Sequence, residues 1–321
     1  MNNNLLILGG SGFIGSALCE KLVRRNRGGN ERITVASRRL SHVRHLQPLP
    51  TVEIVEADLY DDDHLARLVA GRDAVVNLIG ILHGREQDFE RVHAELPRRL
   101  ALACLAAGTR RVIHLSALGA DAQAPSMYLR SKAAGEAALL QQPGLAVTCL
   151  RPSVVFGAGD RFINLFATLQ AFAPLVPLAG AAARFQPVWV EDLAEAILCV
   201  LDDPATAGQT LECAGPRVYT LAELVRLAGC WSGHRRWVWP LPSALAWPMA
   251  WCMEWMPGGP LMSRDNLLSM EVPNVASGHR PGLESLGITP TPLEAIGPGM
   301  LGGGGELARL DRWRAQVHAS R

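Results

Sequence analysis

The sequence predicts a doubly wound α/β fold, in which helices cover both faces of a parallel sheet, followed by a smaller, mostly helical lobe. Six short aliphatic runs alternate with helix-like segments over residues 1–150. The runs are continuously apolar, which is typical of strands buried on both faces of a parallel sheet. We expect a first unit at 1–155, a lobe at 156–296 interleaved with it, and a glycine-rich linker and amphipathic helix at 297–321.

Strands and helices are expected to alternate along the first unit. The predicted strands lie at 5–8, 33–36, 52–55, 74–79, 111–116 and 146–150. Helices are predicted between them at 13–26, 62–70, 88–107 and 126–141. In the second lobe we expect helices at 161–173, 190–202 and 219–229. Thr220 and Glu223 have the spacing of a capping box for the last of these, and Gly229 is expected to end it.

Composition excludes several classes of protein. A net charge of +1 leaves no surplus of basic charge for binding nucleic acid. The seven cysteines are scattered singly, so no disulfide framework is expected, and the start of the chain lacks the basic region of a secretory signal. A cytoplasmic location is therefore predicted. No metal site is expected, because His83, His93 and His114 lack metal-ligand spacing, and we interpret them as polar fillers.

A glycine-rich turn follows the first predicted strand. Gly9, Gly12 and Gly15 allow a sharp turn and a close approach of the backbone to a pyrophosphate, which would bind the N–H groups that open the next helix. Such a turn alone is weak evidence, because glycine commonly connects strands to helices. Its place between a first strand and a helix favours a Rossmann dinucleotide site. The cofactor residues expected in this turn are Gly9, Ser11, Gly12, Phe13, Ile14 and Gly15.

The end of the second predicted strand bears on the choice of dinucleotide. A carboxylate there would bind a ribose 2′-hydroxyl and repel a 2′-phosphate. The sequence instead has Ser37, Arg38 and Arg39, which favours NADP(H) over NAD(H), since guanidinium groups pair well with phosphate. The alternative is a pair of solvated arginines in a chain with only two lysines among its 31 basic residues. Asp58 and Leu59, after the third strand, are expected on the adenine side.

Tyr128 and Lys132 lie four residues apart on a predicted helix, so they share one helix face. A phenol is a poor base at neutral pH, and a neighbouring ammonium is expected to lower its pKa towards the working range. The same ammonium would hold a nicotinamide ribose. Ser116, at the carboxyl end of the fifth strand, would orient a substrate oxygen; its alternative role is a turn cap.

Together these motifs resemble the short-chain dehydrogenase/reductase superfamily in its extended or atypical branch. Within that superfamily, the sequence is most similar to the family of NAD(P)H-binding accessory subunits of respiratory complex I and their bacterial homologues. The stretches that carry this similarity are "NLIG" (77–80), "HLSALGAD" (114–121), "YLRSKAAGE" (128–136), "RPSVVFGAGD" (151–160), "GDRFINLF" (159–166) and "PGGPLMSRDNLLSM" (257–270). The resemblance implies a catalytic trio of Ser116, Tyr128 and Lys132. It also implies further cofactor contacts at Leu78, Ile79, Gly80, Tyr128, Lys132, Pro152 and Val154.

Three functions remain open at the level of sequence. The leading one is NADP(H)-dependent hydride transfer to or from an apolar carbonyl, alcohol or quinone-related substrate. The family resemblance implies an alternative without turnover, a dinucleotide-binding accessory or assembly protein linked to complex I or ubiquinone synthesis. A sugar-nucleotide epimerase or dehydratase would share the trio but would require a more polar second lobe.

Six of the eight tryptophans fall within 231–255, and the segment 237–253 has no charge. Its prolines argue against a membrane span. Trp247, Trp251 and Trp255 recur every four residues, so they would line one side of a short helix. Two interpretations stay open: tryptophans buried in the second lobe, or a surface for a membrane, a respiratory complex or an apolar substrate. A docked surface would place the protein on the inner face of the membrane.

Overall fold

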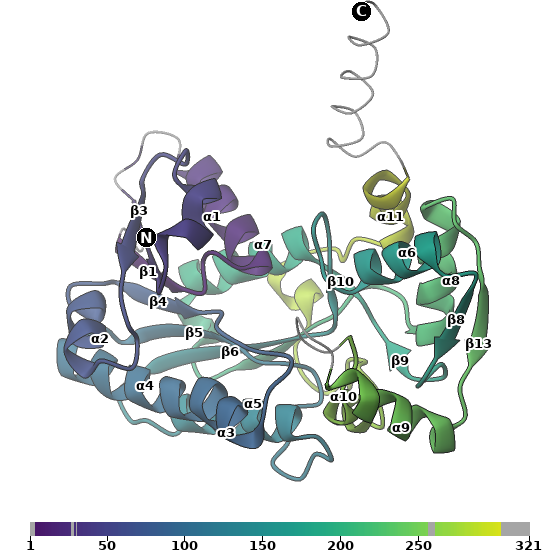
Figure 1. The fold of residues 1–321 in the computed structure, drawn as a ribbon. Coiled ribbons are helices and arrows are strands. Elements are labelled where there is room, and N and C mark those ends of the chain that lie inside the picture. The colour runs from purple at the N-terminus through teal and green to yellow at the C-terminus, as the bar shows by residue number, and fades with distance from the viewer. Residues whose placement is uncertain (1–3, 27–28, 30, 256–260, 303–321) are drawn as a thin grey trace, which may run out of the picture.

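The computed structural model describes residues 4–26, 29, 31–255 and 261–302. Its main sheet has seven strands, all parallel, in the order β11-β6-β5-β4-β1-β2-β3 (Figure 1). The strands are β1 Asn4–Leu8, β2 Arg32–Ser37, β3 Val52–Glu56, β4 Ala74–Asn77, β5 Arg111–Leu115, β6 Ala146–Pro152 and β11 Thr210–Cys213. The strand order reverses between β1 and β4, where ligands bind in open α/β sheets. The predicted doubly wound fold is confirmed.

Two layers of helices cover the sheet. α1 (Phe13–Arg25) and α7 (Val190–Asp202) pack on one face, and α2 (Asp62–Val69), α4 (Leu96–Ala107) and α5 (Met127–Leu140) pack on the other. The helix expected at 88–107 is a composite, because α3 (Glu86–Glu90) runs through a π-helical turn, Arg91–Glu95, into α4. A 3₁₀ segment, Leu40–Leu46, follows β2. Each layer has its own apolar core against the fully buried strands.

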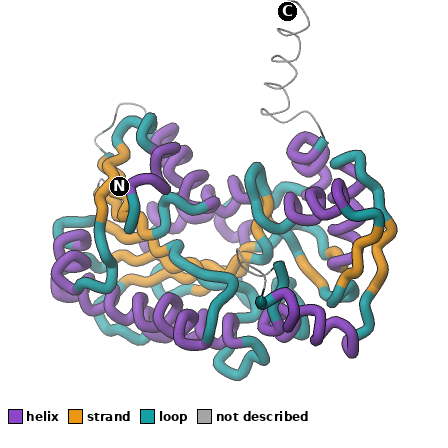
Figure 2. The backbone as a smooth tube through the Cα atoms, in the orientation of Figure 1, coloured by secondary structure: helices purple, strands orange, loops and turns teal. Residues whose placement is uncertain are grey.

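The second lobe lies beside the carboxyl half of the sheet and mixes helices with short paired strands (Figures 1 and 2). Its core is built around Phe156, Phe166, Phe185 and Tyr219. The paired strands are β7 Val155–Phe156 with β10 Val188–Trp189, β9 Arg184–Phe185 with β12 Tyr219–Thr220, and β8 Leu175–Leu178 with β13 Trp237–Pro240. The helices are α6 Ile163–Phe172, α8 Leu221–Trp231, α9 Ser243–Met253, α10 Arg264–Ser269 and α11 Leu293–Leu301. Short 3₁₀ turns lie at Pro204–Thr206 and Leu283–Leu286.

Two sequence expectations about the later part of the chain are wrong. The helix at 190–202 was expected in the second lobe, but α7 packs against α1 in the first unit, and β11 then adds an unpredicted seventh strand. The linker expected from residue 297 is wrong over 297–301, because α11 continues to Leu301, with Gly297 packed against the Trp231 ring. The amphipathic helix expected near the end of the chain lies outside the described residues.

Gly229 does not end its helix, which is a further correction. The capping box of Thr220 and Glu223 is present, but α8 runs on to Trp231. The turn that follows contains Gly233, whose φ of 76° is favourable for glycine, and the His234 N–H donates to the Gly229 carbonyl. Gly229 itself lies against the fully buried Gln170, whose amide donates to the carbonyl oxygens of Phe166 and Val225. Glycine is thus required there for helix packing.

Replacing this packing glycine should destabilise the second lobe. A Cβ at Gly229 would overlap the Gln170 amide, with 2.7 Å to its Cδ, and a buried side chain with two hydrogen bonds has little room to move. We expect Gly229→Ala to lower the free energy of unfolding by about 1–3 kcal/mol in urea titrations. Gly299→Ala is the matched control, since an added Cβ on this helical glycine would meet nothing within 4 Å. The control should be neutral or stabilising, because alanine is the better helix former; equal losses in both variants would contradict this account.

Candidate functional site

The turn between β1 and α1 has the geometry of a phosphate-binding loop. Gly9 has a φ of 83°, and its carbonyl accepts the Gly12 N–H at 3.0 Å. A side chain at Gly15 would overlap the Gly9 carbonyl, so glycine is needed for the helix to begin this close to the strand. The first turn of α1 has no acidic residue, and Gly12 offers no side-chain cap. The N–H groups of Phe13, Ile14 and Gly15 are therefore oriented for an anion.

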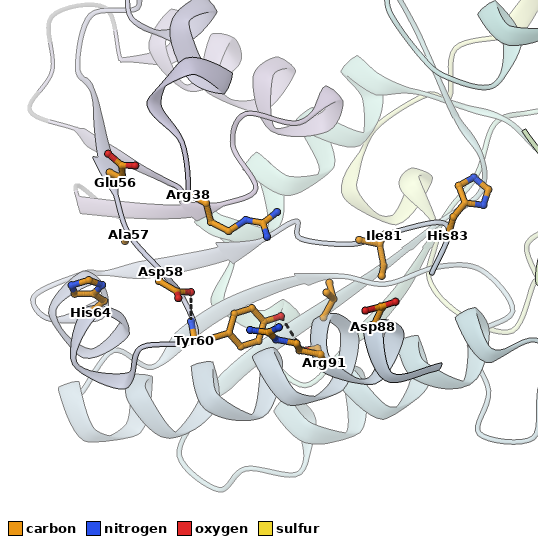
Figure 3. Close-up of a pocket in the computed structure, with 11 residues that line it drawn as sticks. Arg38, Glu56, Ala57, Asp58, Tyr60, His64, Ile81, His83, Asp88 and Arg91 are labelled. Carbon is orange, nitrogen blue, oxygen red and sulfur yellow. Dashed lines mark hydrogen bonds between the residues drawn. The ribbon is translucent and has the colours of Figure 1, made fainter. Parts of the chain in front are cut away.

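A cavity of about 660 Å³ lies at the carboxyl ends of β2, β3 and β4 (Figure 3). Of the predicted residues, Arg38 and Asp58 line it. Asp58 accepts the Tyr60 N–H at 3.0 Å, while Leu59 is buried behind it. Arg39 is not among the lining residues; its N–H and carbonyl bond to the Ser37 hydroxyl instead. The lining consists of Arg38, Glu56, Ala57, Asp58, Tyr60, His64, Ile81, His83, Asp88, Arg91 and Val92.

Arg91, Glu56 and Asp88 are charged residues of this cavity that the sequence analysis missed, and the first two bear on the choice of cofactor. Arg91, from the π-helical turn, lies over the Tyr60 ring with its Cζ 4.1 Å from the ring centroid, and the Tyr60 hydroxyl donates to the Arg91 carbonyl at 3.2 Å. Burial raises the pKa of Tyr60, and nearby Arg91 and Arg38 oppose that shift. Glu56, the end of β3, pairs in register with Ser37 and brings a carboxylate to the same cavity. Neither residue has a sequence signal, since both depend on strand order.

Lys132 lies at the centre of the predicted trio. Its ammonium is buried and donates to the Leu115 carbonyl at 3.1 Å, directly before Ser116. The end of β4 is also close, because a Cβ at Gly80 would lie 3.1 Å from the Lys132 Nζ. Ser116 is buried, and its Oγ has no hydrogen-bond partner among the described residues. An unpaired buried hydroxyl costs about 1–3 kcal/mol, so this oxygen is available to a ligand.

The pKa expected for Tyr128 is wrong in direction. We expected Lys132 to lower it, but burial raises the pKa of the phenol to about 12. The ring lies edge-on to Phe89 and His93, with centroids 6.2 and 5.6 Å away, and these apolar surroundings disfavour a phenolate. Burial also lowers the pKa of Lys132 to about 8, although Glu136 opposes that shift. At neutral pH the pair is therefore a protonated phenol beside an ammonium.

His93 is more than the polar filler that the sequence suggested. Its Nε2 accepts the Ile81 N–H at 3.0 Å, which leaves Nδ1 protonated to donate to the Ser131 hydroxyl at 2.8 Å. Ser131 in turn donates to the Tyr128 carbonyl. Burial, with Lys132 and His114, lowers the pKa of His93 to about 2, so the imidazole stays neutral and keeps this direction. The chain of bonds ties the loop after β4 to the helix that carries the trio.

The other two histidines lie in different surroundings. His114 is buried and bonds to Asn77 at 3.2 Å, as a filler would, while His83 lines the cavity. No cluster of side chains that could hold a metal ion occurs in the described part of the chain.

The start of α5 is held by Asp265, another residue that the sequence analysis missed. Asp265 is buried, and its two oxygens accept the N–H groups of Met127 and Tyr128 at 2.6 and 3.1 Å. A carboxylate at a helix N-terminus is favoured by the helix dipole. Asp265 belongs to α10, within the 257–270 stretch that carried the family resemblance. The second lobe thus positions the backbone of Tyr128.

The segment after β6 is also fixed by the second lobe. Pro152 is buried, and the Val154 N–H donates to Asn274 Oδ1 at 2.9 Å. The Ser153 hydroxyl donates to the same oxygen at 2.6 Å. On β6, the Arg151 guanidinium forms a bidentate ion pair with the carboxylate of the buried Glu136 of α5, at 2.7 and 2.5 Å. The predicted Pro152–Val154 contact surface is therefore rigidly connected to the helix of Tyr128.

These residues fit a nicotinamide dinucleotide. Gly9, Gly12 and Gly15 form a cradle that a side chain would fill, and the unpaired Ser116 hydroxyl and the buried Lys132 ammonium face the same edge of the sheet. The glycine turn and the first turn of α1 would hold the pyrophosphate, and the cavity at Arg38 and Asp58 would hold the adenosine. The bound cofactor would supply a hydride donor or acceptor.

The fold and site define a dinucleotide-binding protein of the extended short-chain type. Residues 5–219 match the model of the NAD dependent epimerase/dehydratase family, and the chain belongs to this family. Membership supports nicotinamide dinucleotide binding.

The chain is also similar to individual proteins and to solved structures. The chain is 33% identical over 296 residues to the mitochondrial NADH dehydrogenase (ubiquinone) 1 alpha subcomplex subunit 9 of Mus musculus, covering 90% of this chain and 77% of that protein. It is 30% identical over 222 residues to a ceramide reductase of Caulobacter vibrioides, covering 68% of each. A crystal structure of a nucleoside-diphosphate-sugar epimerase from Staphylococcus aureus superposes with a TM-score of 0.71 over 92% of this chain and 99% of that one, at 15% identity, which shows a shared fold.

The two lysines of the chain allow a direct test of the Lys132 environment. In ¹³C spectra of the lysine ε-carbons, we expect one signal to titrate with a midpoint near pH 8, because burial disfavours the charged ammonium. Lys132→Met should remove that signal, and Lys21→Arg should leave it unchanged. A Lys132 midpoint above pH 10 would mean that the ammonium is solvated.

Proposed function

We propose that this protein binds NADP(H) and reduces an apolar carbonyl or quinone-related substrate. The observation that carries the proposal is the set of groups at the ends of β4 and β5: a buried ammonium, an unpaired buried hydroxyl and a protonated phenol. A phenol with a pKa of about 12 is protonated at neutral pH, so Tyr128 would act as a general acid.

The preference for NADP(H) rests on two cations. Arg38, which follows β2, and Arg91, from the π-helical turn, both line the adenosine-side cavity. The Tyr60 ring holds Arg91 in place. A 2′-phosphate between them would accept charge-assisted hydrogen bonds from both guanidinium groups. Glu56 opposes this preference, because its carboxylate lies in the same cavity and suits a 2′-hydroxyl. Asp58 and Asp88 weigh less, since each accepts a backbone N–H, from Tyr60 and Arg85.

Cofactor titration separates the lining arginines from the arginine outside the cavity. We expect Arg38→Gln and Arg91→Gln each to weaken NADPH binding at least tenfold, as removal of a charge-assisted bond implies, with little change for NADH. Arg39→Gln is the matched control and should bind both nucleotides like the parent protein. Equal losses in all three variants would indicate a general charge effect, and failure to bind either nucleotide would refute the cofactor assignment.

In the proposed reaction, Ser116 donates its hydroxyl hydrogen bond to the substrate oxygen and Tyr128 delivers a proton to that oxygen. Lys132 holds the nicotinamide ribose, and its positive charge stabilises the phenolate that remains after transfer. The second lobe supplies the substrate contacts. Its stretch 162–183 contains no charged residue, which favours an apolar substrate over a sugar nucleotide. The ceramide reductase among the relatives acts, by its name, on a lipid.

Turnover tests the chemistry. With NADPH and a panel of ubiquinone analogues and long-chain ketones, we expect nucleotide oxidation, followed by its absorbance, to fall at least 100-fold in Tyr128→Phe, because general acid catalysis contributes about that much. NADPH affinity should be unchanged in the variant. Tyr219→Phe is the control, since that phenol donates to Glu294 within the second lobe.

A second candidate is an accessory protein that holds the dinucleotide without turnover. The observation favouring it is the similarity to a complex I subunit over 90% of this chain. Tight NADPH binding with no oxidation by any acceptor would favour this function, and contact with a respiratory complex would then be expected. Turnover with UDP-glucose in place of the carbonyl panel would instead favour the sugar-nucleotide alternative.

A further inference from the structure

The tryptophan-rich segment forms an exposed aromatic surface that the proposed reaction does not use. Trp237 and Trp239 of β13 and Trp247 and Trp251 of α9 are exposed, as is Trp255 just after the helix, with exposed fractions from 42% to 77%. The interpretation of these tryptophans as buried core is therefore wrong. Trp251 and Trp255 lie edge to face, with their ring centroids 6.2 Å apart. We call these five residues the tryptophan surface.

The architecture of α9 explains why its tryptophans point outward. The helix packs on the lobe through small residues, with Ala246 and Ala250 buried. Trp247 and Trp251, one position further along each turn, are directed away from that contact. Leu245 is exposed as well. A helix that buries alanines and exposes tryptophans has its larger apolar face unpartnered, which marks an interaction surface.

A further exposed aromatic side chain lies at the end of α6, near the start of β13. β13 pairs with β8 so that Trp237 lies opposite Leu175, and the Arg236 guanidinium donates to the Gln170 carbonyl at 2.9 Å. Phe172, between these two contact points, is 87% exposed. Exposed apolar side chains are thus found on three elements of the lobe, α6, β13 and α9.

The charges along the sequence of this segment have one sign up to residue 253. From residue 224 to 253 the sequence has no Asp or Glu, and 162–183 has no charge of either sign. Arg235 and Arg236, both exposed, directly precede Trp237. The nearest carboxylate along the chain, Glu254, is paired with the Arg264 guanidinium at 2.9 Å. The segment therefore offers cations and aromatic rings together, and its nearest carboxylate in the sequence is neutralised by an ion pair.

We propose that the tryptophan surface docks this protein on a bilayer that contains anionic lipids. Indole rings favour the boundary between hydrocarbon and headgroups, and arginines beside them meet anionic headgroups. The binding is peripheral: no helix in the described ranges is long and apolar enough to cross a membrane. A second copy of the chain fits less well, because a two-fold contact buries the same patch of both copies and would bring four arginines into one interface. The docking does not require the proposed reaction.

Vesicle flotation of the full-length chain tests this proposal. We expect the protein to float with phosphatidylcholine vesicles that contain phosphatidylglycerol, less with phosphatidylcholine alone, and to be released by salt, which screens the arginines. Trp247→Ala/Trp251→Ala should reduce partitioning at least tenfold, and Arg235→Gln should reduce it on anionic vesicles only. Leu102→Ala is the control, because this leucine is comparably exposed on α4 of the first unit. NADPH affinity of each variant reports that it has folded.

Three results would overturn the proposal. These are no flotation of the parent protein with anionic vesicles, equal flotation of the double tryptophan variant, or flotation that does not depend on anionic lipid. In the first case, a dimer in size-exclusion chromatography that the double variant converts to monomer would assign the surface to a second copy of the chain.

Discussion

The site depends on one physical constraint, the burial of the Lys132 ammonium. A buried charge requires a partner, and Lys132 has the Leu115 carbonyl together with the field of Glu136, one helical turn further on. Glu136 is itself held by Arg151 of β6. The ammonium is thereby fixed at the ends of β4 and β5, directly beside the backbone that leads into Ser116. Its lowered pKa reflects how far the fold has removed it from water.

A second constraint acts on the backbone of the same helix. Asp265 binds the N–H groups of Met127 and Tyr128, and His93 reaches the Tyr128 carbonyl through Ser131. Gly135 lets α5 approach the π-helical turn, since a side chain there would overlap the His93 carbonyl. Ser131 and Gly135, both within "YLRSKAAGE", therefore hold α5 in position. Positioning of this kind matters because acid catalysis requires hydrogen-bond distance to the reacting oxygen.

Local sequence predicted what depends on local spacing. Three features could be predicted because each depends on only a few neighbouring residues. These are the glycines after β1, the strands of the first unit and the Tyr128–Lys132 spacing. Arg91, Glu56 and Asp265 were not predicted, since strand order and the return of α10 bring them to the site. The sign of the Tyr128 pKa shift depends on how much protein surrounds the phenol, which no spacing shows. Gly229 was misassigned for a similar reason: a helix-ending glycine and a packing glycine look alike until Gln170 is in place.

The tryptophan surface and the site share a connected set of contacts. α9 is followed directly by Glu254, whose carboxylate binds both the backbone N–H and the guanidinium of Arg264. The next residue, Asp265, binds the first N–H groups of α5. The ion pair thereby links α9 to α10. If the tryptophan surface docks as proposed, an apolar substrate leaving the bilayer would meet the lobe at α9, next to the helix that positions Tyr128, so a membrane-facing surface and an apolar substrate are physically consistent.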